Sequence, residues 1–183
     1  EQATGEKSVN ILGFCIGGIL VSSTLAYLAA KGQASRVASA TFLTSLFDFK
    51  ETGEVSVFID DDQVAQIEKH VKEKGYLEGT HMANMFSMMR ENDLIWSFVV
   101  NNYLLGREPM AFDLLYWNAD STHMPAKCHL AYLRDYYRDN ALATGKMTLE
   151  GKTLDLGKVK TPVYSICARE DHIAPAESVF RGV

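Results

Sequence analysis

The residues Gly13-Phe14-Cys15-Ile16-Gly17 form the pattern G-x-C-x-G. This pattern is typical of a nucleophile elbow, a tight turn between a strand and a helix, with cysteine where serine is more common. A thiol at a helix N-terminus is suited to attack an acyl group, because the dipole and free N–H groups favour the thiolate and the developing oxyanion. We expect Cys15 to be a catalytic nucleophile and the backbone N–H of Ile16 to be the oxyanion donor.

The two glycines have a physical reason at such a turn. The strand and the helix approach each other closely there, so the neighbours of the nucleophile are expected to be small. The alternative interpretation is that Cys15 is a buried structural cysteine in a glycine-rich turn.

A thiol nucleophile needs a base and an acid that orients the base. In hydrolases with this elbow the chain order is nucleophile, acid, histidine, and Asp171 follows a short apolar run, as the acid would. His172 is not expected to be the base, because adjacent side chains diverge. We expect the catalytic histidine beyond Val183 and further strands before the elbow. The chain is then an internal fragment, incomplete at both ends and inactive by itself.

The other histidines and cysteines show no metal-binding spacing. We expect surface or satisfied polar histidines and small core cysteines at these positions: His70, His81, His123, His129, Cys128 and Cys167. Asp60-Asp61-Asp62 lacks the pattern of a calcium loop and is expected to begin a helix or form a solvated turn. The sequence therefore predicts no metal ion and no cofactor. Three scattered cysteines also favour a reducing compartment over a disulfide framework.

Short apolar strands and one helix rich in small residues are predicted to position Cys15 and Asp171. Residues 9–13 and 37–44 read as buried strands with a helix over 15–30 between them, which is a unit of a parallel sheet. Residues 162–168 read as a third buried strand. The predicted fold class is α/β, an α/β-hydrolase core in which the nucleophile elbow follows a strand of a parallel sheet.

A long, mainly helical insertion separates the second and third of these strands. Helices are expected over 63–74, over 81–90, over 94–105 with Asn92 as N-cap, and from Pro125 to about residue 140, followed by a polar hairpin around Glu150-Gly151. An insertion of this length is too long for an ordinary loop and is expected to be a structured cap or lid. The predicted division is therefore a core of 1–44 and 162–183 and a cap of 45–161.

The composition limits the class of protein. The chain has 183 residues, 47% of them hydrophobic and 22% charged, which is an ordinary globular composition with one core. The net charge of −5 argues against a nucleic-acid partner. The longest apolar stretch, residues 11–30, contains glycines, serines and a threonine, and is too polar for a membrane span.

Four sequence strings resemble one known family, the polyhydroxyalkanoate synthases, and most of all its class I members. The strings are NILGFCIGG at 10–18, NDLIWSFVVNNY at 92–103, FDLLYWNAD at 112–120 and REDHIAP at 169–175. The resemblance implies an α/β-hydrolase core with a mobile cap. It implies a polymerase that links (R)-3-hydroxyacyl-CoA units, such as 3-hydroxybutyryl-CoA, into polyester and releases coenzyme A through a covalent Cys15 acyl-enzyme.

The same resemblance carries expectations for individual residues and partners. Cys15 matches the family nucleophile and Asp171 the catalytic aspartate, while the family histidine lies in a downstream segment that this sequence lacks. The resemblance further implies a homodimer in the cytoplasm, at the surface of the polyester granule. Two alternatives stay open: another thiol hydrolase of this fold, such as a dienelactone-hydrolase-like enzyme or thioesterase, and a non-catalytic granule-binding module.

Overall fold

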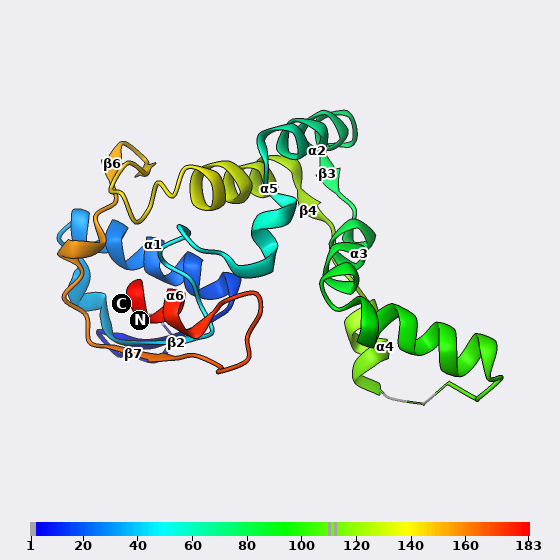
Figure 1. Ribbon diagram of the computed structural model, residues 1–183. Coiled ribbons are helices and arrows are strands. Elements are labelled where there is room, and N and C mark those ends of the chain that lie inside the picture. The colour runs from blue at the N-terminus through cyan, green and yellow to red at the C-terminus, as the bar shows by residue number, and fades with distance from the viewer. Residues whose placement is uncertain (1–2, 110, 112) are drawn as a thin grey trace. The chain divides into compact units, whose positions relative to one another are not determined.

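The computed structural model describes residues 3–109, 111 and 113–183, and the chain divides into two compact units. The first unit comprises the chain up to Asp61 together with Ala131–Val183, and the second comprises Asp62–Leu130. The first unit holds the parallel sheet, and the second is mainly helical (Figure 1). The functional boundaries of a cap, 45–161 in the sequence analysis, stay a prediction.

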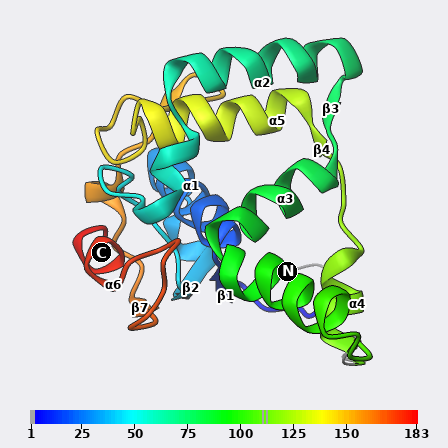
Figure 2. The ribbon, with the colours of Figure 1, turned by 45° about the vertical axis from the view of Figure 1, so that its right-hand side comes forward.

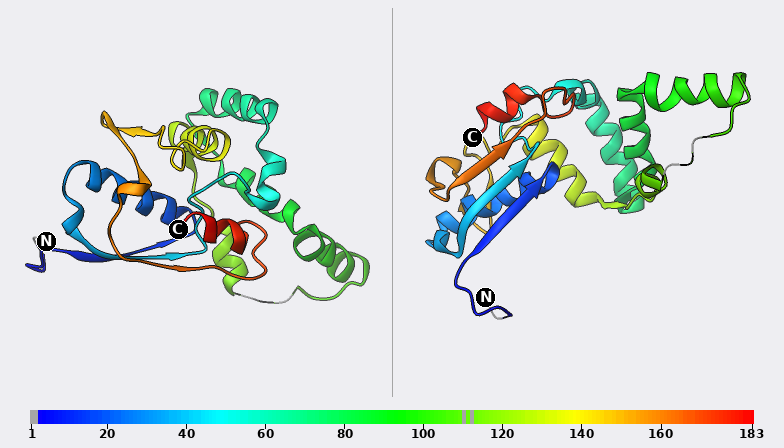
Figure 3. Two further views of the ribbon diagram at one scale, coloured as in Figure 1. Left: turned by 60° about the vertical axis from the view of Figure 1, so that its left-hand side comes forward. Right: turned by 90° about the horizontal axis from the view of Figure 1, so that it is seen from below.

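The sheet of the first unit has three parallel strands in the order β1-β2-β7. They are β1 (Val9–Phe14), β2 (Val37–Leu43) and β7 (Val163–Ile166). The three predicted strands are confirmed, with boundaries within two residues of those expected. The expected burial is wrong for β1 and β7, most of whose residues are exposed, whereas most residues of β2 are buried or half-buried. Because all three strands run in the same direction, their carboxyl ends meet at one edge of the sheet (Figure 3).

Helix α1 (Ile16–Ala30) connects β1 to β2 and packs against both strands (Figure 3). Its residues Val21 and Leu25 are buried in one cluster with Phe42 and Phe47. The rings of Phe42 and Phe47 meet edge to face, with centroids 4.6 Å apart. Burial of each such side chain stabilises the fold by about 1.5–3 kcal/mol, so this core holds the turn between β1 and α1 in place.

A second buried cluster brings the segment after Ala131 back onto α1. It joins Ile19 and Phe49 to Tyr136, Leu142 and Leu154, and all of these residues belong to the first unit. The elements that frame this cluster and complete the unit are η1 (Ala34–Arg36), η2 (Gly53–Phe58), the π-helical segment η5 (Tyr132–Arg138), β5 (Thr148–Leu149), β6 (Lys152–Thr153), η6 (Leu156–Lys158) and α6 (Ala176–Arg181).

The polar hairpin predicted around Glu150-Gly151 is confirmed. It joins the antiparallel strands β5 and β6. Glu150 and Gly151 have φ values of +46° and +72°. Two positive φ values in a two-residue loop are the requirement of the tight turns that suit twisted hairpins.

In the part that the structure describes, the second unit contains helical segments and two short strands. They are α2 (Asp61–Lys74), β3 (Tyr76–Leu77), α3 (Gly79–Met89), the π-helical segments η3 (Asn92–Trp96) and η4 (Val99–Leu104), α4 (Asp113–Ala119), β4 (Met124–Pro125) and α5 (Ala126–Ala131) (Figures 1 and 2). Strands β3 and β4 pair antiparallel. Within the described ranges, no helix has the length and apolar character that crossing a bilayer requires.

Most helices predicted in this region are confirmed, with one error at their ends. Asp61 begins α2, in line with the helix start expected at Asp60-Asp61-Asp62. The expected N-cap role of Asn92 is wrong, because Glu91 already has helical φ and ψ and Asn92 lies inside the helical run. The helix that Pro125 was expected to open is found as α5, followed directly by η5.

Candidate active site

Cys15 occupies the turn between β1 and α1 in a strained backbone conformation, with φ +50° and ψ −120°. Such a conformation costs a non-glycine residue about 1–3 kcal/mol and persists only where the surroundings enforce it. Two backbone hydrogen bonds of 2.9 Å do so here: the Cys15 N–H donates to the Leu43 carbonyl, and the Gly18 N–H donates to the Cys15 carbonyl. The strand, strained turn and helix that the G-x-C-x-G pattern predicts are therefore all present.

The glycines around this turn differ in their importance. A Cβ at Gly13 would lie 2.6 Å from the Gly18 Cα, and a Cβ at Gly18 would collide with the Ser45 side chain. A Cβ at Gly17 would meet no atom within 4 Å among the residues that the structure describes. The expectation of an obligatory small residue is therefore right for Gly13 and wrong for Gly17. The second close approach is made by Gly18, one position beyond the motif.

The electrostatic surroundings of Cys15 determine its protonation. The residue is exposed and accessible to a substrate. Loss of part of the water around its sulfur raises the pKa of the Cys15 thiol above its ordinary value; the Ile16 backbone N–H lowers this pKa by less, and the Asp171 charge raises it further. The helix N-terminus therefore acts in the expected direction but does not by itself produce a thiolate at neutral pH, so thiolate chemistry at Cys15 requires a base.

Asp171 follows β7, at the edge of the sheet where the carboxyl ends of the strands meet, as does Cys15. Its Oδ1 accepts the backbone N–H groups of Ile173 and Ala174, each at 2.9 Å. These two bonds fix the carboxylate in its loop, and its charge reaches Cys15. The structure thus brings the predicted nucleophile and acid to one edge, while their catalytic roles stay a prediction.

The loop that carries Asp171 is also held from outside. The Glu54 N–H donates to the His172 carbonyl at 3.2 Å. Gly53 has φ +57° and lies so close to the His172 carbonyl that a Cβ at Gly53 would collide with it. Sequence reasoning missed this support, because nothing in the sequence links residues 53–54 to residue 172.

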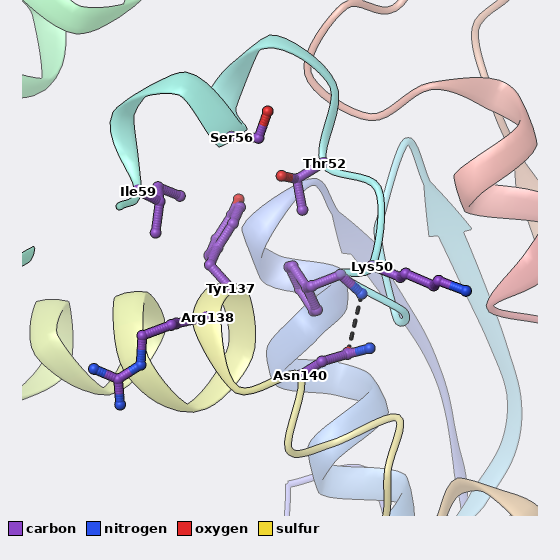
Figure 4. A pocket seen from close by; sticks show the side chains of 8 residues that line it. Lys50, Thr52, Ser56, Ile59, Tyr137, Arg138 and Asn140 are labelled. Carbon is purple, nitrogen blue, oxygen red and sulfur yellow. Dashed lines mark hydrogen bonds between the residues drawn. The ribbon is translucent and has the colours of Figure 1, made fainter. Parts of the chain in front are cut away.

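A pocket of about 350 Å³ opens beside Tyr137 in the first unit. Figure 4 shows the Tyr137 hydroxyl directed toward Thr52 and Ser56. The pocket is lined by Phe49, Lys50, Thr52, Ser56, Ile59, Tyr137, Arg138 and Asn140. Burial raises the pKa of Tyr137 to about 12, and the charge of ionised Cys15 adds to the shift. Tyr137 is therefore a neutral phenol within electrostatic reach of Cys15, a proximity that the sequence analysis did not predict.

Two expectations for individual residues are wrong. Cys128 and Cys167 are exposed, although we expected small core residues. His70 was expected to be on the surface or to have a partner, but its Nε2 is buried without a hydrogen-bond partner in the described part of the chain. His70, Glu78 and His81 form the one group of potential metal ligands found among the described residues.

Comparison with known proteins places these features in a family context. The family model for the alpha/beta hydrolase fold matches residues 1–180. The predicted fold class, an α/β-hydrolase core with a parallel sheet and a nucleophile elbow, is confirmed by this match and by the observed strands.

Individual relatives are similar over nearly the whole chain. A poly(3-hydroxyalkanoate) polymerase of Methylorubrum extorquens is 57% identical over 180 residues, which are 98% of this chain and 30% of that protein. Subunit PhaC of such a polymerase in Rhizobium meliloti is 52% identical over 100% of this chain and 30% of that protein. Subunit PhaC in Cupriavidus necator is 44% identical over 98% of this chain and 31% of that protein. The resemblance indicated by the four sequence strings is confirmed, and the chain spans about 30% of the length of these curated relatives.

Proposed function

Since this chain belongs to the family of proteins with the alpha/beta hydrolase fold, we propose that it is the nucleophile-bearing segment of a poly(3-hydroxyalkanoate) polymerase. The observation that supports this most directly is the strained turn at Cys15, with φ +50°, between β1 and α1. A hydrolase-type elbow that carries sulfur suits transfer of an acyl group from one thioester to another acceptor. The polymerases to which the chain is 44–57% identical supply the substrate class.

The first step of the proposed reaction is acylation of Cys15. The Cys15 thiolate attacks the thioester carbon of an (R)-3-hydroxyacyl-CoA, and the Ile16 N–H stabilises the oxyanion. The bond between the acyl carbon and the coenzyme A sulfur breaks, and coenzyme A leaves with a proton from the base. Because one thioester replaces another, this exchange is nearly neutral in free energy.

The second step transfers the acyl group to an alcohol. The 3-hydroxyl of an incoming unit or of the growing chain attacks the Cys15 thioester, loses its proton to the base and forms the ester bond. In this proposal a histidine outside these 183 residues is the base, and Asp171 orients it and stabilises its charged form. The two hydrogen bonds that fix the Asp171 Oδ1 support this orienting role.

The acyl-enzyme must react with an alcohol before it reacts with water. We assign the exclusion of water to a cap formed by the helical insertion, since closure over a site is the physical means to that end. The described part of the second unit exposes several large aromatic side chains, among them Trp96, Tyr103 and Trp117. Exposed apolar groups of this kind support a contact with polyester granules or with a second copy of the protein.

Intact mass spectrometry of the full-length protein tests the proposal. The protein is mixed with (R)-3-hydroxybutyryl-CoA and quenched in acid, and we expect a ladder of hydroxybutyryl additions. The ladder should vanish in Cys15→Ala and persist in Cys128→Ala, which removes another exposed cysteine. A single adduct that clears to free acid would identify a thiol hydrolase instead. Unmodified protein together with unchanged substrate would favour the non-catalytic alternative.

A further inference from the structure

Two histidines and a glutamate, for which the sequence suggested no common role, lie together in the second unit. His70 belongs to α2, Glu78 directly precedes α3 and His81 lies in the first turn of α3 (Figure 2). Each offers one ligand atom, and these atoms all lie within 4.8 Å of one another. The two imidazole centroids are 5.0 Å apart, and the His81 Nε2 lies 3.4 Å from the Glu78 Oε2.

His70 distinguishes this cluster from an ordinary group of surface charges. Its Nε2 is buried and has no hydrogen-bond partner among the described residues. A buried polar atom without a partner loses its hydration without compensation, which is why such atoms are rare in folded proteins. A bound cation would give this nitrogen the partner that the protein does not.

We propose that His70, Glu78 and His81 bind a divalent transition-metal ion, with zinc as the best match. Two imidazoles and a carboxylate are a common zinc ligand set, and a water molecule can complete a tetrahedron. Ligand bonds of about 2.0–2.2 Å put neighbouring ligand atoms roughly 3.4 Å apart. The side chains of His81 and Glu78 are 50% and 31% exposed. They therefore have room to rotate toward an ion held at the buried His70 nitrogen.

Lys74 competes with the ion for the same carboxylate. Its ammonium group donates a 2.8 Å hydrogen bond to the Glu78 Oε1. Lys74 is half-exposed and can turn into solvent when the ion binds. Its charge nevertheless repels a cation, which makes the site weaker than its ligands alone would be.

The site would join two helices through a short connection. His70 lies in the second half of α2, and Glu78 and His81 lie at the start of α3, with β3 between them. An ion bound to all three residues therefore fixes the angle at which α3 leaves α2. Metal binding is in this case a structural clamp within the second unit and is independent of the reaction proposed for Cys15.

Metal titration of the full-length protein, with any affinity tag removed and metal stripped by a chelator, tests the inference. We expect one equivalent of Co²⁺ to bind with a visible d–d spectrum, and Zn²⁺ to displace it. His70→Ala and His81→Ala should weaken zinc binding by roughly 100-fold or more, since loss of even an outer partner costs 10- to 100-fold. Circular dichroism verifies the fold of each variant, and His81→Ala replaces a half-exposed side chain. It therefore provides the test if His70→Ala does not fold.

Two lysine variants give a test of opposite sign. Lys74→Ala removes the competitor of Glu78 and should tighten zinc binding on the order of tenfold, from the loss of one close repulsive charge. Lys72→Ala is the matched control, because Lys72 lies on the same helix but pairs with Glu68, and it should leave the affinity unchanged. The inference is overturned if no equivalent binds or if His81→Ala binds as tightly as the parent. Equal affinities of the two lysine variants would remove Glu78 from the site and overturn the ligand set.

Discussion

At Cys15 the backbone conformation suits a nucleophile, whereas the thiol is not ionised at neutral pH. The positive φ directs the residue out of the turn and leaves it exposed, as an attacking nucleophile must be. Its thiol pKa is raised, above all by the loss of part of the water around the sulfur, so the thiol is protonated at neutral pH. The backbone geometry of Cys15 therefore suits a nucleophile, whereas its thiol still has to lose a proton. Asp171 has two expected effects on this ionisation: its charge disfavours the thiolate, and in the proposed reaction it orients the base that takes the proton.

Asp171→Asn separates these two influences. The Asp171 charge disfavours the thiolate, so its removal lowers the pKa of Cys15 and increases the thiolate fraction at every pH below that value. We therefore expect faster alkylation of Cys15 by iodoacetamide at pH 7.5. Polymerisation should instead fall by roughly 10⁴-fold, the cost of replacing the acid of a serine-protease triad by asparagine.

The side-chain oxygen of asparagine can still accept the N–H groups of Ile173 and Ala174, so the loop should keep its shape. Glu170→Gln, an exposed neighbour, is the control and should change neither rate. Slower alkylation of the Asp171→Asn protein would contradict the assigned electrostatics.

The elbow glycines allow a second test at the scale of single residues. Gly13→Ala forces a Cβ to within 2.6 Å of the Gly18 Cα. We expect a loss of about 2–3 kcal/mol in the free energy of unfolding, as for other overpacked sites, together with loss of Cys15 acylation. Gly17→Ala meets open space on a helix and should be neutral or stabilising by up to about 1 kcal/mol. Urea unfolding of both variants checks this, and equal destabilisation would show that the motif and not the contact governs the turn.

The predictability of the site differed from residue to residue. The candidates Cys15, Ile16 and Asp171 could be named because a motif and a chain order define them, and both are properties of sequence; their catalytic roles stay predictions. Tyr137 and the cluster around His70 were not, because their neighbours are brought together by folding and not by spacing. Gly17 was misjudged for a related reason: the motif names positions, whereas the close contact is set by where α1 passes β1, at Gly18.

At the scale of elements, the end of η5 is tied to the segment after β2 by one side chain. The Asn140 Oδ1 accepts the Phe49 N–H at 3.0 Å, and its Nδ2 donates to the Asp48 Oδ1 at 2.6 Å. Asn140 itself has φ +46°, in the left-handed region. The residue thus ends a helix and anchors the wall of the pocket beside Tyr137 (Figure 4).

Two replacements of Asn140 separate the contribution of its side-chain hydrogen bonds from that of its left-handed backbone. Asn140→Ala loses both hydrogen bonds and strains the left-handed backbone, and should cost about 2–4 kcal/mol of unfolding free energy. Asn140→Gly loses the same bonds but accepts the positive φ, and should cost about 1 kcal/mol less. Chemical denaturation of the two variants measures the difference. Identical midpoints would mean that the backbone is not strained in the folded protein.

Strands and most helices were accessible from the sequence, but the π-helical type of η3, η4 and η5 was not. Short apolar stretches, rich in β-branched and aromatic residues, indicate β1 and β2 in the sequence. The run after Arg90 was correctly expected to be helical, yet η3 and η4 have π-helical hydrogen bonding. An apolar pattern reports which face of a helix is covered. It does not distinguish bonds to the fifth residue from bonds to the fourth, so this feature could not be predicted.

At the scale of the whole molecule, buried apolar side chains are distributed unevenly. In the described part of the second unit they are Val64, Val71, Leu77 and Met89, whereas the first unit has two clusters around α1 and the sheet. Since opening free energies follow local packing, we expect the amides of β1, β2 and α1 to exchange slowest. Those of α3, η3 and η4 should exchange faster on the order of 100-fold or more.

Hydrogen–deuterium exchange of the full-length protein, read at the level of peptides, measures this difference. Peptides from α6 are a useful internal comparison, because Val179 of this short helix is buried in the first unit. Uniform protection across both units would contradict the expected distribution of stability.

The pairing of β2 with β7 also has a consequence for how the chain is made. β2 ends at Leu43 and its neighbour begins at Val163, so a ribosome releases β1, α1 and β2 well before the third strand exists. Until then one edge of β2 is unpaired, and such edges invite association with other chains. The turn at Cys15 needs only the Leu43 carbonyl and α1, so it can form early, whereas the Asp171 loop arrives last. In the order of synthesis, Cys15 is therefore in position before Asp171.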